Sequence, residues 1–125
     1  MPRQGPLKLK AQLFCGEERA FGPGRADVLE AIAREGSISA AGRSLGMSYR
    51  FIWLLVDSMN RCFRERLVET AAGGSRGGGA VLTDAGRRAL AAYRALEAQM
   101  MQGARGGPLD TLCALLRDEP IPPAS

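Results

Sequence analysis

The stretch GSISAAGRSLGMSYRFIW, residues 36–53, determines the fold that we expect for the whole chain. It contains two short segments in which apolar residues recur at helical spacing, and Gly46 separates them. Ser37 or Ser39 can cap the first helix and Ser48 the second, because a serine hydroxyl accepts a hydrogen bond from a free backbone amide. Glycine readily adopts the left-handed conformation that ends a helix. The stretch therefore predicts two helices joined by a tight turn.

The second of these helices has one apolar face. Ile52, Val56, Met59 and Phe63 recur at i, i+4, i+7 and i+11, so this stripe is expected to face the core. The opposite face then carries Tyr49, Arg50, Trp53 and Asp57. Two alternatives remain open at this point: Trp53 could be wedged between helices, and Tyr49 could cover an edge of the core.

The segments before this stretch predict a strand and a further helix. Residues 7–15, LKLKAQLFC, alternate apolar and polar side chains at first, which indicates a strand, and residues 16–24 are typical of a turn. Residues 25–34 predict a helix with an inward face formed by Val28, Leu29, Ile32 and Ala33. Gly36 is expected to end that helix.

After the two helices, the sequence predicts a β-hairpin and two more helices. LVET (67–70) and AVLT (80–83) are typical of strands, and the loop between them, residues 71–79, holds five glycines. Thr83 can cap a helix of about eighteen residues. A shorter amphipathic helix is expected over residues 109–116, where it could dock a partner or fold back on a dimer, and residues 118–125 are expected to be disordered.

The composition limits the classes of function. The chain has 125 residues, enough for one domain with a core, and a net charge of +4. Residues 1–82 contain 12 Arg and Lys against 8 Asp and Glu, whereas the remainder contains 5 of each. A basic first part points to a polyanion such as nucleic acid, although a solvated basic face that aids solubility is the simpler alternative.

Other residue types argue against several kinds of site. The three cysteines are far apart without a CxxC spacing, and there is no histidine, so neither a zinc site nor a disulfide framework is expected. We expect the thiols to be buried as small apolar side chains. Without histidine, a paired-carboxylate pocket or a nucleophile motif, we expect neither an enzyme nor a cofactor. No membrane span or signal peptide is evident, so the protein is expected to be cytoplasmic.

The order of elements is that of a winged helix-turn-helix domain, mainly α with a small β-hairpin wing and a long C-terminal dimerisation helix. The second helix of such a unit enters the major groove of double-stranded DNA. There Arg50 could bind guanine O6 and N7, and Tyr49 and Trp53 could contact a thymine methyl group, a sugar or a phosphate. Ser48 and the first backbone amides could bind a phosphate. An arginine in the first turn opposes the helix dipole, which a nearby anion would offset.

The glycine-rich loop has two interpretations. As the wing of the domain, it would place Arg76 against the DNA backbone or in the minor groove. As an ordinary loop, it is only a flexible hairpin end. No GK[ST] follows it, so it is not a nucleotide-binding P-loop.

Two runs carry a resemblance to a known family. GSISAAGRSLGMSY resembles the helix-turn-helix of LysR-type regulators, and GMSYRFIWLLVDSMN followed by LVETAAGGSRGGGAVLTDAGRRAL resembles the DNA-binding domain of the molybdate-responsive ModE family. The resemblance implies a homodimer on a palindromic operator. By position, it implies DNA contacts from Ser48, Tyr49, Arg50, Trp53 and Arg76, and phosphate contacts from Ser37, Ser39 and Thr83.

The resemblance covers residues 20–102, so we expect a DNA-binding domain over residues 1–102 and a linker, short helix and tail over residues 103–125. About 23 residues after the long helix are too few for the oxyanion-binding domains of the full-length family members. Sensing of molybdate is then expected to be absent or to reside on a separate sensor protein. Two alternative functions stay open: a small module that binds molybdate or phosphate, and a protein-interaction module on the same scaffold.

Overall fold

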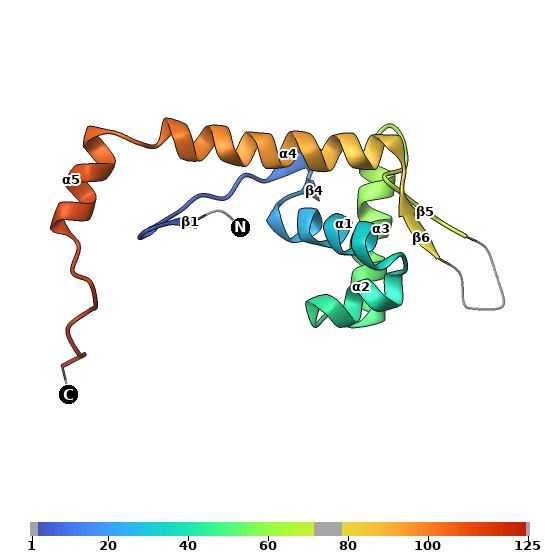
Figure 1. The fold of residues 1–125 in the computed structure, drawn as a ribbon, viewed down its shortest axis with the longest axis horizontal. Coiled ribbons are helices and arrows are strands. Elements are labelled where there is room, and N and C mark those ends of the chain that lie inside the picture. Colours follow the sequence, from blue (N-terminus) through green and yellow to red (C-terminus); the bar gives the residue numbers. More distant parts are fainter. Residues whose placement is uncertain (1–2, 72–78, 125) are drawn as a thin grey trace.

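The computed structural model describes residues 3–71 and 79–124. In these ranges the helices are α1 (Pro23–Glu35), α2 (Ile38–Leu45), α3 (Tyr49–Cys62), α4 (Asp84–Gly103) and α5 (Gly107–Leu115). The strands are β1 (Arg3–Gln4), β2 (Leu7–Lys8), β3 (Leu13–Cys15), β4 (Glu18–Phe21), β5 (Val68–Thr70) and β6 (Ala80–Leu82). Each sheet is a two-stranded antiparallel hairpin, which confirms the winged helix-turn-helix class (Figure 1).

The turn between α2 and α3 forms as its residues predict. Ser37 is the N-cap of α2, and its hydroxyl accepts a hydrogen bond from the Ala40 amide at 3.0 Å. Ser48 caps α3 in the same way, with 3.1 Å to the Phe51 amide. Gly46 ends α2 with a φ of 68°, a left-handed conformation that glycine adopts without strain. Local capping therefore fixes where each helix begins and ends.

The first helix begins earlier than predicted. α1 starts at Pro23. Proline suits the first helical position, because its ring fixes a helical φ and the backbone N–H that it lacks would have no partner within the helix there. Gly36 ends the helix as expected, with a φ of 78°. Val28, Leu29 and Ile32 are buried, whereas Ala33 is exposed, so the prediction of Ala33 as a core residue was wrong.

The prediction of one strand over residues 7–15 followed by a turn was also wrong. The segment contributes β2 and β3, and β4 lies within the residues expected to be a turn. Gly16, at a φ of 60°, closes a tight turn that pairs Cys15 with Glu18. The pairing directs Ala20 and Phe21 into the core, and their burial stabilises a strand that begins with polar residues.

The core lies between α1, α3, the β3–β4 and β5–β6 hairpins and the first half of α4. It is built from Phe21, Leu29, Ile32, Ile52, Val56, Met59, Leu67, Val68 and Tyr93, together with smaller residues. Phe63, predicted on the inward stripe of α3, is half-buried and packs edge-on against Phe21 with ring centroids 5.9 Å apart. The other predicted core positions of α3 are fully buried.

The wing joins the helix-turn-helix through backbone hydrogen bonds. β5 and β6 pair with Val68 opposite Leu82, and the Ala80 amide donates to the Gly36 carbonyl at 2.8 Å. Residues 72–78 of the loop between the strands, including Arg76, lie outside the described residues, so the role of this loop as a wing tip stays a prediction.

α4 crosses one side of the molecule and extends beyond the core, and α5 lies at its far end (Figure 1). Thr83 caps α4 as predicted. Arg94 ties α4 to α1 through ion pairs with Asp27 and Glu30, and it also pairs with Glu97 on its own helix. α5 has no buried residue, and residues 118–124 form neither helix nor strand.

Two further observations concern the cysteines and the membrane. Cys15 is exposed, and Cys62 and Cys113 are half-buried, so the expectation that all three thiols are buried was wrong. Among residues 3–71 and 79–124, no helix combines the length and the apolar character that crossing a membrane requires.

Candidate nucleic-acid interface

The end of α3 that follows the turn is open to solvent. α3 begins beside α2, on the side of the molecule away from α4 (Figure 1). Ser48, Tyr49, Arg50 and Phe51 are all exposed there. The first turn of a helix carries unpaired backbone amides and the positive end of the helix dipole, which together favour an anion. This end of α3 therefore suits contact with a phosphate chain.

Arg50 is free to bind a ligand. It forms no ion pair or hydrogen bond with any residue of the described ranges. Its exposed guanidinium is a planar fork that matches the two acceptors of a guanine or a phosphate. The structure thus leaves Arg50 in the state that the sequence interpretation requires.

The sequence left open whether Trp53 is wedged between helices and whether Tyr49 covers an edge of the core. The structure gives a different answer for each residue. Trp53 is half-buried and packs against the core, so it does not stand freely on the exposed face as proposed. Tyr49 is exposed and does not cover the core edge. The two rings meet edge-on with centroids 6.4 Å apart, so Trp53 packs against the Tyr49 ring.

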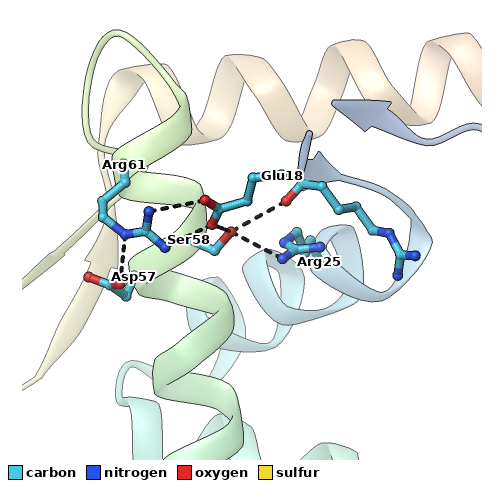
Figure 2. A network of polar contacts seen from close by, with 6 residues as sticks. Glu18, Arg25, Asp57, Ser58 and Arg61 are labelled. Atoms are coloured by element: carbon cyan, nitrogen blue, oxygen red, sulfur yellow. Dashed lines mark hydrogen bonds and ion pairs between the residues drawn. The ribbon is translucent and has the colours of Figure 1, made fainter. Parts of the chain in front are cut away.

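The second half of α3 is held by a polar network (Figure 2). Arg61 donates to Glu18 at 2.7 Å and to Asp57 at 2.9 Å, so both carboxylates share this one cation. Ser58 donates to Glu18 at 2.8 Å and accepts from Arg25 at 3.2 Å. Through these contacts, the network connects α3 to β4 and α1.

The network also changes the acidity of its members. Hydrogen bonds from Arg61 and then Ser58 lower the pKa of the Glu18 carboxyl below its ordinary value, because they stabilise the carboxylate. The same contacts, with Glu18 first and Asp57 second, raise the pKa of Arg61. Burial lowers the pKa of Arg25. Asp57, which the sequence placed on the exposed face, is thus occupied by Arg61.

The four hydroxyl groups named as phosphate ligands differ in their chemistry. The hydroxyls of Ser37 and Ser48 accept from backbone amides, and each keeps a proton that it can donate to a phosphate. Ser39 is exposed in the first turn of α2. Thr83 donates its proton to the Arg66 carbonyl at 2.6 Å, so it has none left for a phosphate. The structure therefore favours the three serines over Thr83.

Sequence reasoning missed two apolar residues on the same surface. Phe51 is 48% exposed and Leu54 is 54% exposed, and both lie within one turn of Arg50 along the helix. Their positions were available as a signal, since Leu54 lies two residues after the buried Ile52 and therefore near the opposite face. Arg43, in the last turn of α2, is a further exposed cation with no partner in the described ranges.

Comparison with known proteins agrees with this geometry. Residues 25–87 match the family model described as bacterial regulatory helix-turn-helix protein, lysR family. The chain is 52% identical over 73 residues to the molybdenum transport protein ModE of Azotobacter vinelandii. It is 51% identical over 78 residues to the molybdenum-pterin-binding protein MopB of Rhodobacter capsulatus. It is 42% identical over 98 residues to the DNA-binding transcriptional dual regulator ModE of Escherichia coli K12.

These matches cover 58%, 62% and 78% of the chain, respectively. They cover only 27%, 29% and 35% of the three relatives. The chain therefore spans between about a quarter and a third of the length of the relatives it matches.

Proposed function

The chain belongs to the LysR family of bacterial regulatory helix-turn-helix proteins, and from this we propose that it is a DNA-binding transcriptional regulator that acts as a dimer. α3 enters the major groove, with Arg50 toward a guanine and Tyr49 toward the backbone. Ser37, Ser39 and Ser48 bind phosphates, and Arg76 contacts the backbone or the minor groove from the wing. The observation that carries the proposal is the solvent-exposed start of α3, where Arg50 has no partner in the described ranges.

A dimer is supported by an apolar surface on the opposite side. Leu13, Phe21, Phe63, Tyr93 and Leu96 help to line an open groove of about 180 Å³ between the β3–β4 hairpin and α4. Leu13 of this lining is exposed, as is its neighbour Phe14 on β3. We propose that a second copy covers this groove with its own α4. Binding of such a dimer to two half-sites requires its two α3 helices to lie about 34–36 Å apart, one turn of DNA.

We further propose that residues 1–102 form the DNA-binding unit, that the protein acts in the cytoplasm, and that it has no catalytic role. Relatives that match 78% of this chain bear names of transcriptional regulators, which supports a function without catalysis. The two alternative functions, an oxyanion module and a protein-interaction module, are not favoured, because the matched family is one of regulatory helix-turn-helix proteins. A separate sensor protein stays a prediction.

Selection of bound sequences from random double-stranded DNA with the full chain tests this function. We expect a palindromic site with half-sites one turn apart, and a steep loss of affinity as salt is raised, because each neutralised phosphate releases counterions. Arg117→Ala is the control for loss of one positive charge outside the proposed interface, since Arg117 lies beyond α5 and is exposed. Recovery of random sequences, with no salt-dependent binding, would rule the proposal out.

A further inference from the structure

The exposed face of α3 is apolar at its centre. Arg50, Leu54, Asp57 and Arg61 follow one another at i, i+4, i+7 and i+11, opposite the buried stripe of Ile52, Val56 and Met59. Phe51 lies three residues before Leu54 and is therefore its neighbour on the helix surface. We call residues 49–54 the contact segment, because this is the part of α3 before the polar network begins.

The fold does not require these two apolar side chains. The core positions of α3 are filled by Ile52, Val56 and Met59, each at most 1% exposed. One exposed leucine on a protein surface is common and carries no message. Here, however, Phe51 and Leu54 gather in one turn beside an arginine without a partner in the described ranges. They lie on the second helix of the helix-turn-helix, the element that enters the major groove in such units.

The charged groups of the same face divide it into two halves. Asp57 and Arg61 bind each other, and Arg61 also binds Glu18, so the second half offers a DNA duplex no unpaired cation. In the contact segment the only charged side chain is Arg50. A base pair facing this segment would meet one guanidinium and two apolar side chains.

From this arrangement we infer that Leu54, with Phe51 beside it, recognises the 5-methyl group of a thymine. The inference rests on the proposed function, since it assumes that α3 lies in the major groove. The thymine methyl is the apolar group that base pairs present in that groove. Four residues of helix rise about 6 Å, and base pairs are spaced about 3.4 Å apart. The thymine is therefore one or two base steps from the base pair that Arg50 contacts.

Replacement of thymine by uracil tests the inference directly, because it removes the methyl group and leaves base pairing unchanged. The site selected by the full wild-type chain is synthesised with each thymine replaced in turn, symmetrically in both half-sites. We expect one position at which uracil weakens binding about threefold to tenfold per half-site, the effect of one methyl contact. In Leu54→Ala, uracil at this position should have little effect on affinity. In Leu54→Met, part of the affinity loss caused by uracil should return.

Leu115→Ala is the matched control, because Leu115 is 77% exposed and lies on α5, outside the contact segment. Its profile of uracil effects should match that of the wild type, whatever its overall affinity. If the wild type selects a defined site but tolerates uracil at every thymine, the inference is wrong and the proposed function stands. If no sequence is selected, both are wrong. The first measurement uses the wild-type chain alone, so poor folding of a variant cannot obscure it.

Discussion

Asn60 on α3 holds the backbone of Val68 on β5 from both sides. The Asn60 amide nitrogen donates to the Val68 carbonyl at 3.1 Å, and the Asn60 oxygen accepts from the Val68 amide at 3.2 Å. The same oxygen accepts from the Leu67 amide at 2.8 Å. One side chain thus fixes the first strand of the wing against the end of the helix that carries the proposed DNA contacts.

Removing this side chain should therefore be costly. Asn60→Ala leaves the two amides and the carbonyl without their partner, and we expect the free energy of unfolding to fall by about 1–3 kcal/mol. Urea denaturation followed by circular dichroism measures this change. Gln99→Ala, on the exposed surface of α4, is the control and should change stability by less than about 0.5 kcal/mol. Equal stability of both variants would show that the three hydrogen bonds contribute nothing net.

A second prediction concerns Gly86 in the first turn of α4. A Cβ atom at this position would lie 2.1 Å from the Leu67 carbonyl oxygen, well inside van der Waals contact, and the obstacle is backbone. We expect Gly86→Ala to destabilise the protein by about 1–3 kcal/mol or more, because α4 must move away from the wing. Gly24→Ala in α1, where a Cβ would meet nothing within 4 Å, should be neutral or stabilising by up to about 1 kcal/mol. Thermal unfolding of the two variants compares them, and a stable Gly86→Ala protein would contradict the packing described.

The pKa of Glu18 predicts a dependence of stability on pH. Arg61 and Ser58 lower this pKa in the folded state, so the unfolded chain takes up the proton first as the pH falls. The stabilisation is complete above the ordinary value near 4.5 and is lost as the pH drops through the lowered folded value. We expect the wild type to be more stable than Glu18→Gln at pH 7 and the difference to vanish in acid. Glu17→Gln, on the exposed neighbouring residue, is the control for the removal of one negative charge from this strand region.

Arg94 provides a prediction about the attachment of α4. Its guanidinium pairs with Asp27 and Glu30 on α1 and with Glu97, whose side chain is only 7% exposed. Arg94→Met removes the cation and leaves the Glu97 carboxylate nearly buried without its partner, at a cost of about 2 kcal/mol. The double variant Arg94→Met, Glu97→Gln should recover part of that loss, because the uncompensated charge is gone. Failure of the double variant to recover any melting temperature would mean that the desolvated charge is not the cause.

Arg50 is the residue for which DNA selectivity gives the clearest test. Arg50→Ala should reduce the preference for guanine at one position of each half-site by about 1–3 kcal/mol while non-specific binding persists. Competition between the selected site and its single-base variants measures the preference. Arg88→Ala, an exposed arginine on α4, should lower affinity for all sequences alike if it has any effect. A wild-type pattern of preferences in Arg50→Ala would remove Arg50 from base recognition.

The helix-turn-helix could be predicted from sequence because its determinants are local. Ser37, Gly46 and Ser48 each act on the backbone within three residues, so capping and the turn follow from the residues themselves. The β3–β4 hairpin could not be predicted in this way. β4 begins with charged residues, and its place depends on burial of Phe21 and on contacts of Glu18 with α3, forty residues further along the chain.

The position of the candidate interface could be predicted from the sequence, but the residues that form it could be predicted only in part. The buried stripe of α3 locates the centre of the exposed face, but not the width of the part that neighbouring elements cover. Trp53 lies on the flank of the stripe and is partly covered, whereas Leu54 is not. An apolar residue is assigned to the core by default in a sequence, so Leu54 was overlooked until its surroundings were visible.

The division of α3 into a free first half and a fixed second half makes the helix suitable for reprogramming. Substitutions at Arg50, Phe51 or Leu54 alter side chains that the scaffold does not use, so new operator preferences could arise without loss of stability. Substitutions at Ser58, Asn60 or Arg61 would instead remove hydrogen bonds that hold the helix against β4 and the start of the wing. Within a lineage, paralogues are then expected to diverge at Arg50, Phe51 and Leu54 and to retain Ser58, Asn60 and Arg61. An engineer would randomise only the first three positions.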